Sequence, residues 1–300
     1  MAPARLALAD ERARVAIVPE LGAGLASYDL ADSDDEQPLF RRCREAEAAH
    51  PFDLACNLLI PWSGRVSGGG FSFGGQFYPL APTIEEEPLP IHGNGFAAPW
   101  TVLEASPARA SLGLRSAGPG PYDYEAEVAY ALADGALSIA LAVTHRGADP
   151  LPYGLGLHPW LPRTPATTLW APAATVTIED SRHLPAGQVP VAARRDWNFN
   201  QRRRLPGAWV NNDFSPWPGQ AEIAWPDRGL ALDVSTGGDP HLSSYILYSP
   251  ASDADFFCFE PVTHPVDAHN QPGGPERHGL VPLAHGEQLA VSCRFTPRRL

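Results

Sequence analysis

The stretch DFFCFEPVTH, residues 255–264, has the pattern of a buried strand that carries a carboxylate at its end. Its first half is apolar and aromatic, and turn-forming residues precede it, as expected at a strand boundary. Because side chains alternate between the two faces of a strand, Phe257 and Phe259 should point one way, and Cys258 and Glu260 the other. The stretch therefore predicts a carboxylate that faces a cavity, although a solvent-exposed Glu is the ordinary interpretation of an isolated case.

A second stretch, LPYGLGLHPW at residues 151–160, repeats this arrangement with an imidazole in place of the carboxylate. His158 is followed by Pro159, just as Glu260 is followed by Pro261. Proline has no N–H to give to a neighbouring strand, so regular pairing is expected to stop at both positions. The two stretches together predict one acidic and one basic group, each fixed at the end of a strand.

Composition favours a protein built from strands. The chain has 300 residues with 33 Pro and 27 Gly, and proline at this density excludes many long helices while favouring short strands joined by turns. Alternation is clearest at residues 122–132 and 137–144, which flank an Asp-Gly turn, and a further hairpin is expected at residues 71–80. Residues 40–50 hold the one plausible short helix.

No repeat of fixed period and no convincing linker interrupts the chain. We therefore expect a single domain over residues 1–300, with an all-β fold: a large antiparallel β-sandwich in which sheet packs on sheet.

Charge and targeting signals limit the partners. The net charge of −12 makes nucleic acid and anionic membrane surfaces poor partners, and no apolar run approaches the ~20 residues needed to span a bilayer. The start of the chain has no signal-peptide pattern, and the four cysteines form no C-x-x-C pair. We expect a cytoplasmic protein with reduced thiols.

Four polar residues stand at predicted strand ends or in glycine-rich loops: Arg65, His92, His158 and Glu260. Each one alone has a structural explanation, because a strand-end histidine is commonly a hydrogen-bonded structural residue and an arginine can cap a turn. Aromatic residues such as Trp160 could stack on a ligand or pack in the core.

Taken together and in order, these motifs resemble those of the aldose 1-epimerase (mutarotase) superfamily. The matching segments are residues 57–80, 91–93, 100, 156–160 and 259–264. The resemblance implies a β-sandwich of the galactose-mutarotase type with a sugar bound in an open cleft on one sheet. It further implies that His158 is the general acid and Glu260 the general base, while His92 and Arg65 contact the sugar.

Two positions depart from the family pattern. The family usually has an Asp three residues before a Phe, where this chain has Asn211, which can bind a hydroxyl but carries no charge. The segment IPWSGR, residues 60–65, is closer to less typical branches, so a sugar phosphate or an unusual hexose is a further possibility. We expect Arg65, His92, Asn211 and Trp160 to bind the sugar.

The chemistry of anomer exchange agrees with this assignment. Ring opening removes the proton of the C1 hydroxyl while the ring oxygen is protonated, and reclosure reverses both transfers. A carboxylate and an imidazole suffice, so we expect no metal and no redox cofactor. The expected partner is a small sugar, and the sequence predicts no oligomeric state.

Alternatives remain at this point. One is a hexose-6-phosphate 1-epimerase of the same superfamily, with the basic loop at residues 194–204 as a phosphate clamp or merely a solvated loop. Another is a non-catalytic carbohydrate-binding module, which would bind sugar without accelerating any reaction.

Two further alternatives depend on other side chains. A metal site could use His92, His158, His264 and Glu260, although their spacing matches no short ligand motif. A glycosidase would need a second carboxylate about 5–9 Å from Glu260, and the matched motifs contain none.

Overall fold

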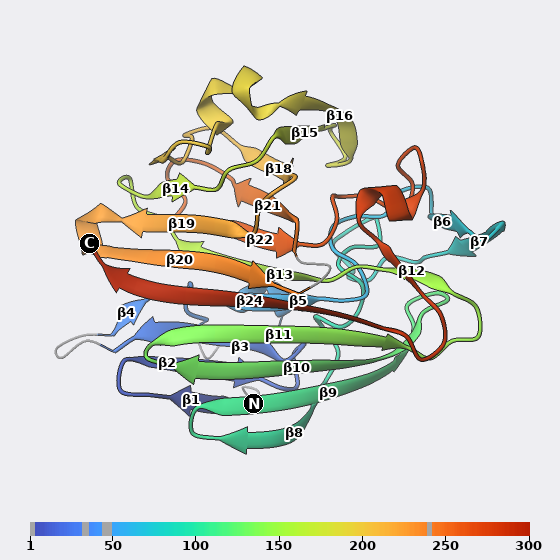
Figure 1. Ribbon diagram of the computed structural model, residues 1–300, viewed down its shortest axis with the longest axis horizontal. Helices are drawn as coiled ribbons and strands as arrows, with labels where there is room; N and C mark the ends of the chain where they lie inside the picture. Colours follow the sequence, from blue (N-terminus) through green and yellow to red (C-terminus); the bar gives the residue numbers. More distant parts are fainter. Residues whose placement is uncertain (1–3, 32–35, 44–49, 239–241) are drawn as a thin grey trace.

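The computed structural model describes residues 4–31, 36–43, 50–238 and 242–300. In these residues nearly all regular structure is antiparallel strand, arranged as two large sheets that pack face to face (Figure 1). The predicted all-β sandwich is therefore confirmed.

The first large sheet has eleven strands among the described residues. In spatial order they are β1 (Leu6–Ala9), β2 (Ala13–Val18), β3 (Gly24–Leu30), β5 (Cys56–Leu59), β13 (Gly156–Pro162), β22 (Phe256–Val262), β21 (Ser244–Ser249), β18 (Val210–Ser215), β15 (Thr175–Glu179) and β16 (Pro185–Pro190), with β4 (Gln37–Pro38) paired to β3.

The second large sheet has nine strands in the same part of the chain. They are β17 (Arg203–Arg204), β14 (Thr168–Trp170), β19 (Gln220–Trp225), β20 (Leu230–Gly237), β24 (Gln288–Arg299), β11 (Ala136–His145), β10 (Asp123–Ala133), β9 (Arg109–Ala117) and β8 (Thr101–Ser106). Two smaller pairs join β12 (Leu151–Tyr153) to β23 (Val281–Leu283) and β6 (Gly70–Phe73) to β7 (Gln76–Pro79).

Alternation along the strands builds the core between the two sheets. In β10 and β11, buried and more exposed residues alternate as predicted, and the turn between them places Asp134 and Gly135 at positive φ. In the first sheet, Phe257 and Phe259 are fully buried in this core, while Glu260 lies on the opposite face. Tyr245 packs on Phe259 with ring centroids 4.8 Å apart.

The structure corrects the prediction that pairing stops at the two prolines. Strand β22 continues to Val262 and β13 continues to Pro162. Glu260 and His158 consequently lie inside strands rather than at their ends.

The gap in pairing falls between β13 and β22 instead. These two strands pair at Gly156 and again from Trp160 onward, with no pair recorded at the residues between them. On its other side β22 stays paired with β21, where Tyr245 lies opposite Pro261. A proline loses a hydrogen bond only to the one neighbouring strand that its N–H would have faced. Pairing with the strand on the other side continues, so the strand itself is not interrupted.

Other expectations have mixed outcomes. Residues 40–43 form no helix, and residues 44–49 of the predicted short helix lie outside the described part; His50 caps a short 3-10 turn, η2 (Pro51–Asp53). The other 3-10 turns in the described part of the chain are η3 (Val191–Ala193), η4 (Arg195–Trp197), η5 (Pro226–Arg228) and η6 (Pro275–His278). All four cysteines are buried and form no disulfide.

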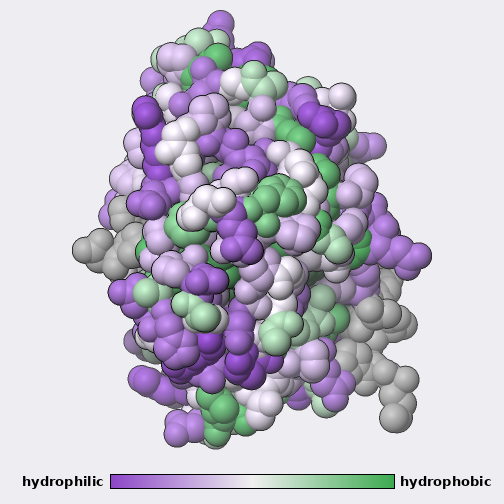
Figure 2. Space-filling view, turned by 90° about the vertical axis from the view of Figure 1, so that its right-hand side faces the viewer, coloured by the Kyte–Doolittle hydropathy of each residue, from purple (hydrophilic) through white to green (hydrophobic). Residues whose placement is uncertain are grey.

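The surface is of mixed polarity. At the end of the molecule that carries the β6–β7 hairpin, hydrophilic and apolar side chains are interspersed (Figure 2). None of the described helices is long and apolar enough to cross a membrane.

The core position of Phe259 gives a stability prediction. Phe259→Ala should lower the free energy of unfolding by about 3–5 kcal/mol, because it leaves a cavity between the sheets. Phe77→Ala is the matched control, since 53% of Phe77 is exposed. Chemical denaturation measures both variants, and equal losses would contradict the assignment of the core face.

Candidate active site

A row of side chains crosses the outer face of the first sheet at one level. Asp213 lies opposite Ile246, and Ile246 lies opposite Glu260. His158 also belongs to this row. The pairs Gly156–Val262 and Trp160–Cys258 follow the same register, which places His158 level with Glu260. At the other end, the Thr177 hydroxyl donates to the Asp213 carboxylate over 2.9 Å. Residues directly opposite in antiparallel strands point to the same face, so the five side chains form one continuous floor.

A second row lies two residues further along the same strands. It contains Glu179, Asn211, Tyr248, Cys258 and Trp160, of which Asn211 is opposite Tyr248 and Tyr248 is opposite Cys258. Residues two apart on a strand share a face, so this row extends the same floor.

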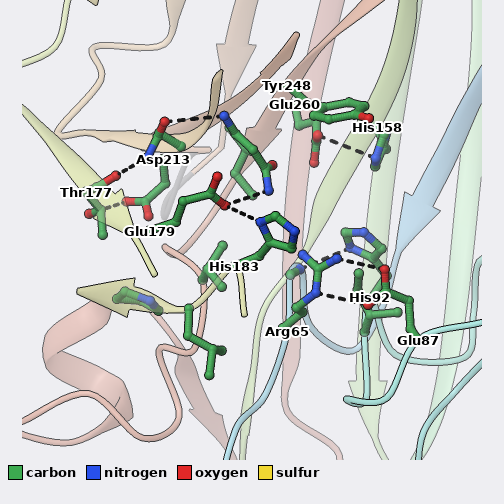
Figure 3. Close-up of a pocket in the computed structure, with 18 of the residues that line it drawn as sticks. Arg65, Glu87, His92, His158, Thr177, Glu179, His183, Asp213, Tyr248 and Glu260 are labelled. Carbon is green, nitrogen blue, oxygen red and sulfur yellow. Dashed lines mark hydrogen bonds and ion pairs between the residues drawn. The ribbon is translucent and has the colours of Figure 1, made fainter. Parts of the chain in front are cut away.

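Loops close the sides of the cleft. With Arg65, Glu87 and His92 from these loops, the two rows line a cavity of about 300 Å³ (Figure 3). Cys258 is fully buried and does not line it.

Glu260 and His158 form a buried pair at one end of the floor. His158 Nε2 lies 3.4 Å from Glu260 Oε1. Burial raises the pKa of Glu260 to about 8, against the opposing effect of the nearby Arg65 charge. Burial likewise lowers the pKa of His158 to about 3. Between these two values the pair holds one proton in total.

Aromatic packing orients the His158 ring. The ring stacks on Trp160 at a centroid distance of 5.0 Å and an interplanar angle of 21°. Phe52 packs beside both rings. Among the described residues no group bonds His158 Nδ1, so on this side of the ring packing rather than a hydrogen bond holds the imidazole.

His92 presents a defined face to the cleft. The Gly64 N–H donates to His92 Nδ1 over 3.0 Å, so the proton of the neutral ring is on Nε2. Burial, together with the charges of His158 and Arg65, keeps the pKa of His92 well below its usual value. Gly93 follows at φ +66°, where a Cβ would lie 1.9 Å from the Ile60 carbonyl oxygen, so this turn requires glycine.

Arg65 enters the cleft already paired. Its guanidinium donates to both carboxylate oxygens of Glu87, over 2.7 and 3.1 Å. Its backbone carbonyl accepts from the Asp267 N–H, and the Asp267 carboxylate in turn accepts from Ser67. Arg65 is therefore held in place from both its backbone and its side chain.

The opposite end of the cleft gathers polar groups around Glu179. This carboxylate accepts from Asn211 Nδ2 over 2.9 Å, from His183 Nδ1 over 2.7 Å and from Trp209 Nε1 over 2.6 Å. An amide at position 211 can donate to Glu179, whereas an aspartate there would repel it. The charge that the sequence departure at Asn211 removes is thus supplied here by Glu179.

Sequence reasoning missed the carboxylates of Asp213, Glu179 and Glu87. Asp213 is almost fully buried, and burial raises its pKa to about 6, opposed by hydrogen bonds that include one from the Val266 N–H. Strand alternation from Asn211 could have revealed Asp213, while Glu179 required knowledge of the strand pairing. None of these three carboxylates belongs to the motifs on which the sequence analysis relied.

All six predicted site residues line this one cleft: Arg65, His92, His158, Trp160, Asn211 and Glu260. None of the arginines in the 194–204 loop does so, and Arg202 pairs instead with Glu222 on the other sheet.

The four-ligand metal set expected as an alternative does not assemble. Both ring nitrogens of His264 are engaged, with the Ser63 N–H and the Pro265 carbonyl oxygen. The described residues instead bring together ligand atoms of His158, Cys258 and Glu260, all within 4.8 Å of one another.

Fold and site define a β-sandwich of the galactose mutarotase type, and comparison with known proteins agrees. A family model described as aldose 1-epimerase matches residues 4–296. The Escherichia coli K12 protein YphB, itself uncharacterized, is 35% identical over 259 residues, covering 84% of this chain and 86% of YphB. A crystal structure from E. coli K12, provisionally named an aldose 1-epimerase, superposes with a TM-score of 0.89 at 29% identity and covers 99% of both chains.

A more distant solved structure shares the fold. The GalM/aldose epimerase homologue from C. elegans has a TM-score of 0.82 at 18% identity and covers 99% of each chain. The protein belongs to the aldose 1-epimerase family. This membership supports its assignment as a carbohydrate epimerase.

The buried state of Glu260 predicts how stability depends on pH. Its pKa is higher in the folded protein than in the unfolded chain, so the folded state binds the extra proton and loses stability as pH rises toward about 8. Glu260→Gln removes this loss. Its melting temperature should therefore rise relative to the wild type between about pH 5 and about pH 9.

Calorimetry across this pH range measures the effect. The control is Glu127→Gln, because Glu127 is an exposed residue of β10. A constant difference between Glu260→Gln and the wild type at all pH values would show that Glu260 is ionised in the folded protein throughout.

Proposed function

We propose that the protein interconverts the α and β anomers of an unphosphorylated aldose by opening and reclosing its ring. The observation that carries the proposal is the Glu260–His158 pair, 3.4 Å apart in the cleft of an aldose 1-epimerase family member. The reaction as proposed needs no cofactor.

The proton inventory of the pair suits this reaction. Below about pH 8 the one proton of the pair rests on Glu260, so it first passes to His158 across the 3.4 Å contact. Glu260, then ionised, is the general base that takes the proton of the C1 hydroxyl, while His158, then protonated, is the general acid that gives its proton to the ring oxygen. The bond between C1 and the ring oxygen breaks, and an open-chain aldehyde forms. After rotation about the C1–C2 bond, both transfers reverse and the ring closes on the other face of C1. One group must accept and the other donate, and a pair that holds one proton supplies both functions.

Other groups in the cleft would position the sugar. The His92 Nε2–H can donate to a reacting oxygen, and Arg65 can stabilise negative charge that develops there. Asn211 and Glu179 offer polar atoms to the hydroxyls at the far end. Trp160 gives an apolar surface on which the ring can lie.

Charge in the cleft favours a neutral sugar over a sugar phosphate. Four carboxyl groups line it, those of Glu87, Glu179, Asp213 and Glu260, of which Glu260 is protonated below about pH 8, against the single guanidinium of Arg65, which is itself paired with Glu87. A phosphate would meet mostly like charge, and the basic loop at residues 194–204 does not reach it. This argues against the hexose-6-phosphate alternative.

The additional carboxylates reopen the glycosidase alternative. Asp213 is two strands from Glu260, roughly 9–10 Å at the usual strand spacing. Its carboxylate already accepts hydrogen bonds from Thr177 and Val266, and His158 is nearer to Glu260. An assay of aryl glycoside hydrolysis distinguishes a glycosidase from an enzyme that exchanges anomers.

We also infer a cytoplasmic location, supported by the buried cysteines Cys56, Cys258 and Cys293, which form no disulfide.

The acid–base assignment predicts the effect of two substitutions. Glu260→Gln keeps the size of the side chain but cannot accept the proton, so anomer exchange should slow by about 10²–10⁴-fold. His158→Asn should cost a comparable factor, and the double variant little more, because the two groups act in one exchange. Sugar affinity should change by less than about tenfold.

Exchange is followed by proton NMR with free aldoses and their 6-phosphates side by side. Glu127→Gln is the matched control, since Glu127 is an exposed carboxylate on β10 of the other sheet. Anomer exchange at the wild-type rate in Glu260→Gln would contradict the assignment of Glu260 as the general base. If the wild-type protein binds sugar but does not accelerate anomer exchange, the protein is a binding module instead.

The pair also predicts a bell-shaped pH profile. kcat/KM should be greatest between the two values of the coupled pair, about 3 and about 8. Above about 8 the pair loses its proton, no acid remains, and kcat/KM should fall about tenfold per pH unit. The spontaneous rate is subtracted at each pH. An enzymatic rate that keeps rising well above about pH 8 would rule out a shared proton as the catalytic one.

A further inference from the structure

His264 is a buried imidazole that takes no part in the proposed acid–base step. It lies just beyond the end of β22, the strand that carries Glu260, and only 1% of it is exposed. It does not line the cleft. Its neighbour Thr263 is bonded twice to Leu155: the Thr263 N–H donates to the Leu155 carbonyl oxygen over 2.9 Å, and the Leu155 N–H donates to Thr263 Oγ1 over 3.1 Å. The backbone at His264 is therefore anchored to the segment that enters β13, the strand of the general acid.

The two ring nitrogens of His264 have different partners. Nδ1 lies 2.8 Å from the Pro265 carbonyl oxygen, which can only accept, so Nδ1 carries the proton. Nε2 accepts from the Ser63 N–H over 3.1 Å. Burial lowers the pKa of His264 to about 4, so near neutral pH the ring is uncharged and the lone pair of Nε2 is available. His264 is thus a fixed acceptor for one backbone N–H.

The ring fits in this position because residue 154 is a glycine. A Cβ at Gly154 would lie 2.1 Å from His264 Cδ2 and 2.3 Å from His264 Nε2. The Gly154 N–H also donates to the Pro61 carbonyl oxygen over 2.7 Å. The segment between β12 and β13 therefore holds the loop of residues 60–65 directly, and it leaves the space from which His264 holds the same loop.

The next peptide of this loop is held by a second imidazole. The Gly64 N–H donates to His92 Nδ1 over 3.0 Å, and the His92 N–H donates back to the Gly64 carbonyl oxygen over 3.1 Å. Arg65 follows directly, and its side chain lies near the His92 ring in the cleft (Figure 3). Two successive backbone N–H groups thus end on two imidazoles. Any shift of this backbone would move both Arg65 and His92.

We propose that His264 is a positioning residue for anomer exchange. By accepting the Ser63 N–H, it holds the backbone of residues 63–64. That backbone in turn places Arg65 and His92 where they reach the reacting oxygens. The inference rests on the proposed function, which gives these two side chains that task. Position matters at this level, because a displacement of about 1 Å in a catalytic group can slow a reaction about 100-fold.

Two substitutions separate the acceptor of His264 from its bulk. His264→Leu keeps an apolar side chain in the space but leaves the buried Ser63 N–H without this acceptor. Its kcat for glucose and galactose should fall at least about tenfold, while KM changes by less than about threefold, because Arg65 and His92 act mainly on charge that develops in the transition state. His264→Gln places an amide oxygen near the position of Nε2 and should keep kcat within about threefold of the wild type.

The His92 ring supplies a measurement that does not depend on activity. In the wild type its Nδ1 accepts and its Nε2 carries the proton, so nitrogen NMR should give two well-separated signals. In His264→Leu these signals should move toward each other, because a weaker bond from Gly64 lets the second tautomer form. In His264→Gln they should keep their wild-type values. Leu280→Ala is the matched control, since Leu280 is buried beside Gly154 and its loss removes packing without removing the acceptor.

Each outcome decides one of the two proposals. Wild-type kcat and wild-type His92 signals in His264→Leu would overturn the positioning role, as would a Leu280→Ala variant that reproduces both changes. A folded His264→Gln that fails to restore them would show that the acceptor is not the cause. His264→Asn, whose amide ends short of Nε2, should behave as His264→Leu does and takes its place if that variant does not fold. If the wild type accelerates no sugar, anomer exchange is wrong, whereas the His92 signals still decide whether His264 holds the loop.

Discussion

The register of five neighbouring strands is the constraint on which the site depends. β15, β18, β21, β22 and β13 pair so that side chains distant in sequence meet at one level of the sheet. A shift of one residue in any pair would move its site residues to the core face. The aromatic core holds this register, because the residues between the site positions, such as Phe257 and Phe259, fill the space between the sheets. The packing of side chains on one face of β22 therefore positions the site residues on its other face.

Burial then determines the protonation of the site. Glu260 and His158 are shielded from water by Trp160, Phe52 and the Arg65 and His92 loops, and both groups favour their neutral forms. A carboxyl and an imidazole that exchange a single proton need little solvent reorganisation when a sugar binds. The cost is a destabilised carboxylate within the fold. That cost is typical of sites at which acid and base chemistry is performed.

The far end of the cleft shows how a local sequence change is compensated in space. Asn211 replaces the family's usual acidic residue, and the neighbouring strand supplies Glu179 in hydrogen-bonding contact with it. The carboxyl groups that line the cleft outnumber its one guanidinium, that of Arg65.

The sequence by itself determined the fold class and most of the site. Proline density and period-two alternation indicated the strands, because both depend only on local backbone chemistry. The family motifs identified Arg65, His92, His158 and Glu260, which line one cleft. Tertiary structure alone decided that β13 and β22 run through their prolines, because a missing N–H is tolerated where the other neighbour keeps the strand paired. It alone brought Glu179 and Asp213 to the site, because cross-strand neighbours are set by pairing between segments far apart in the chain.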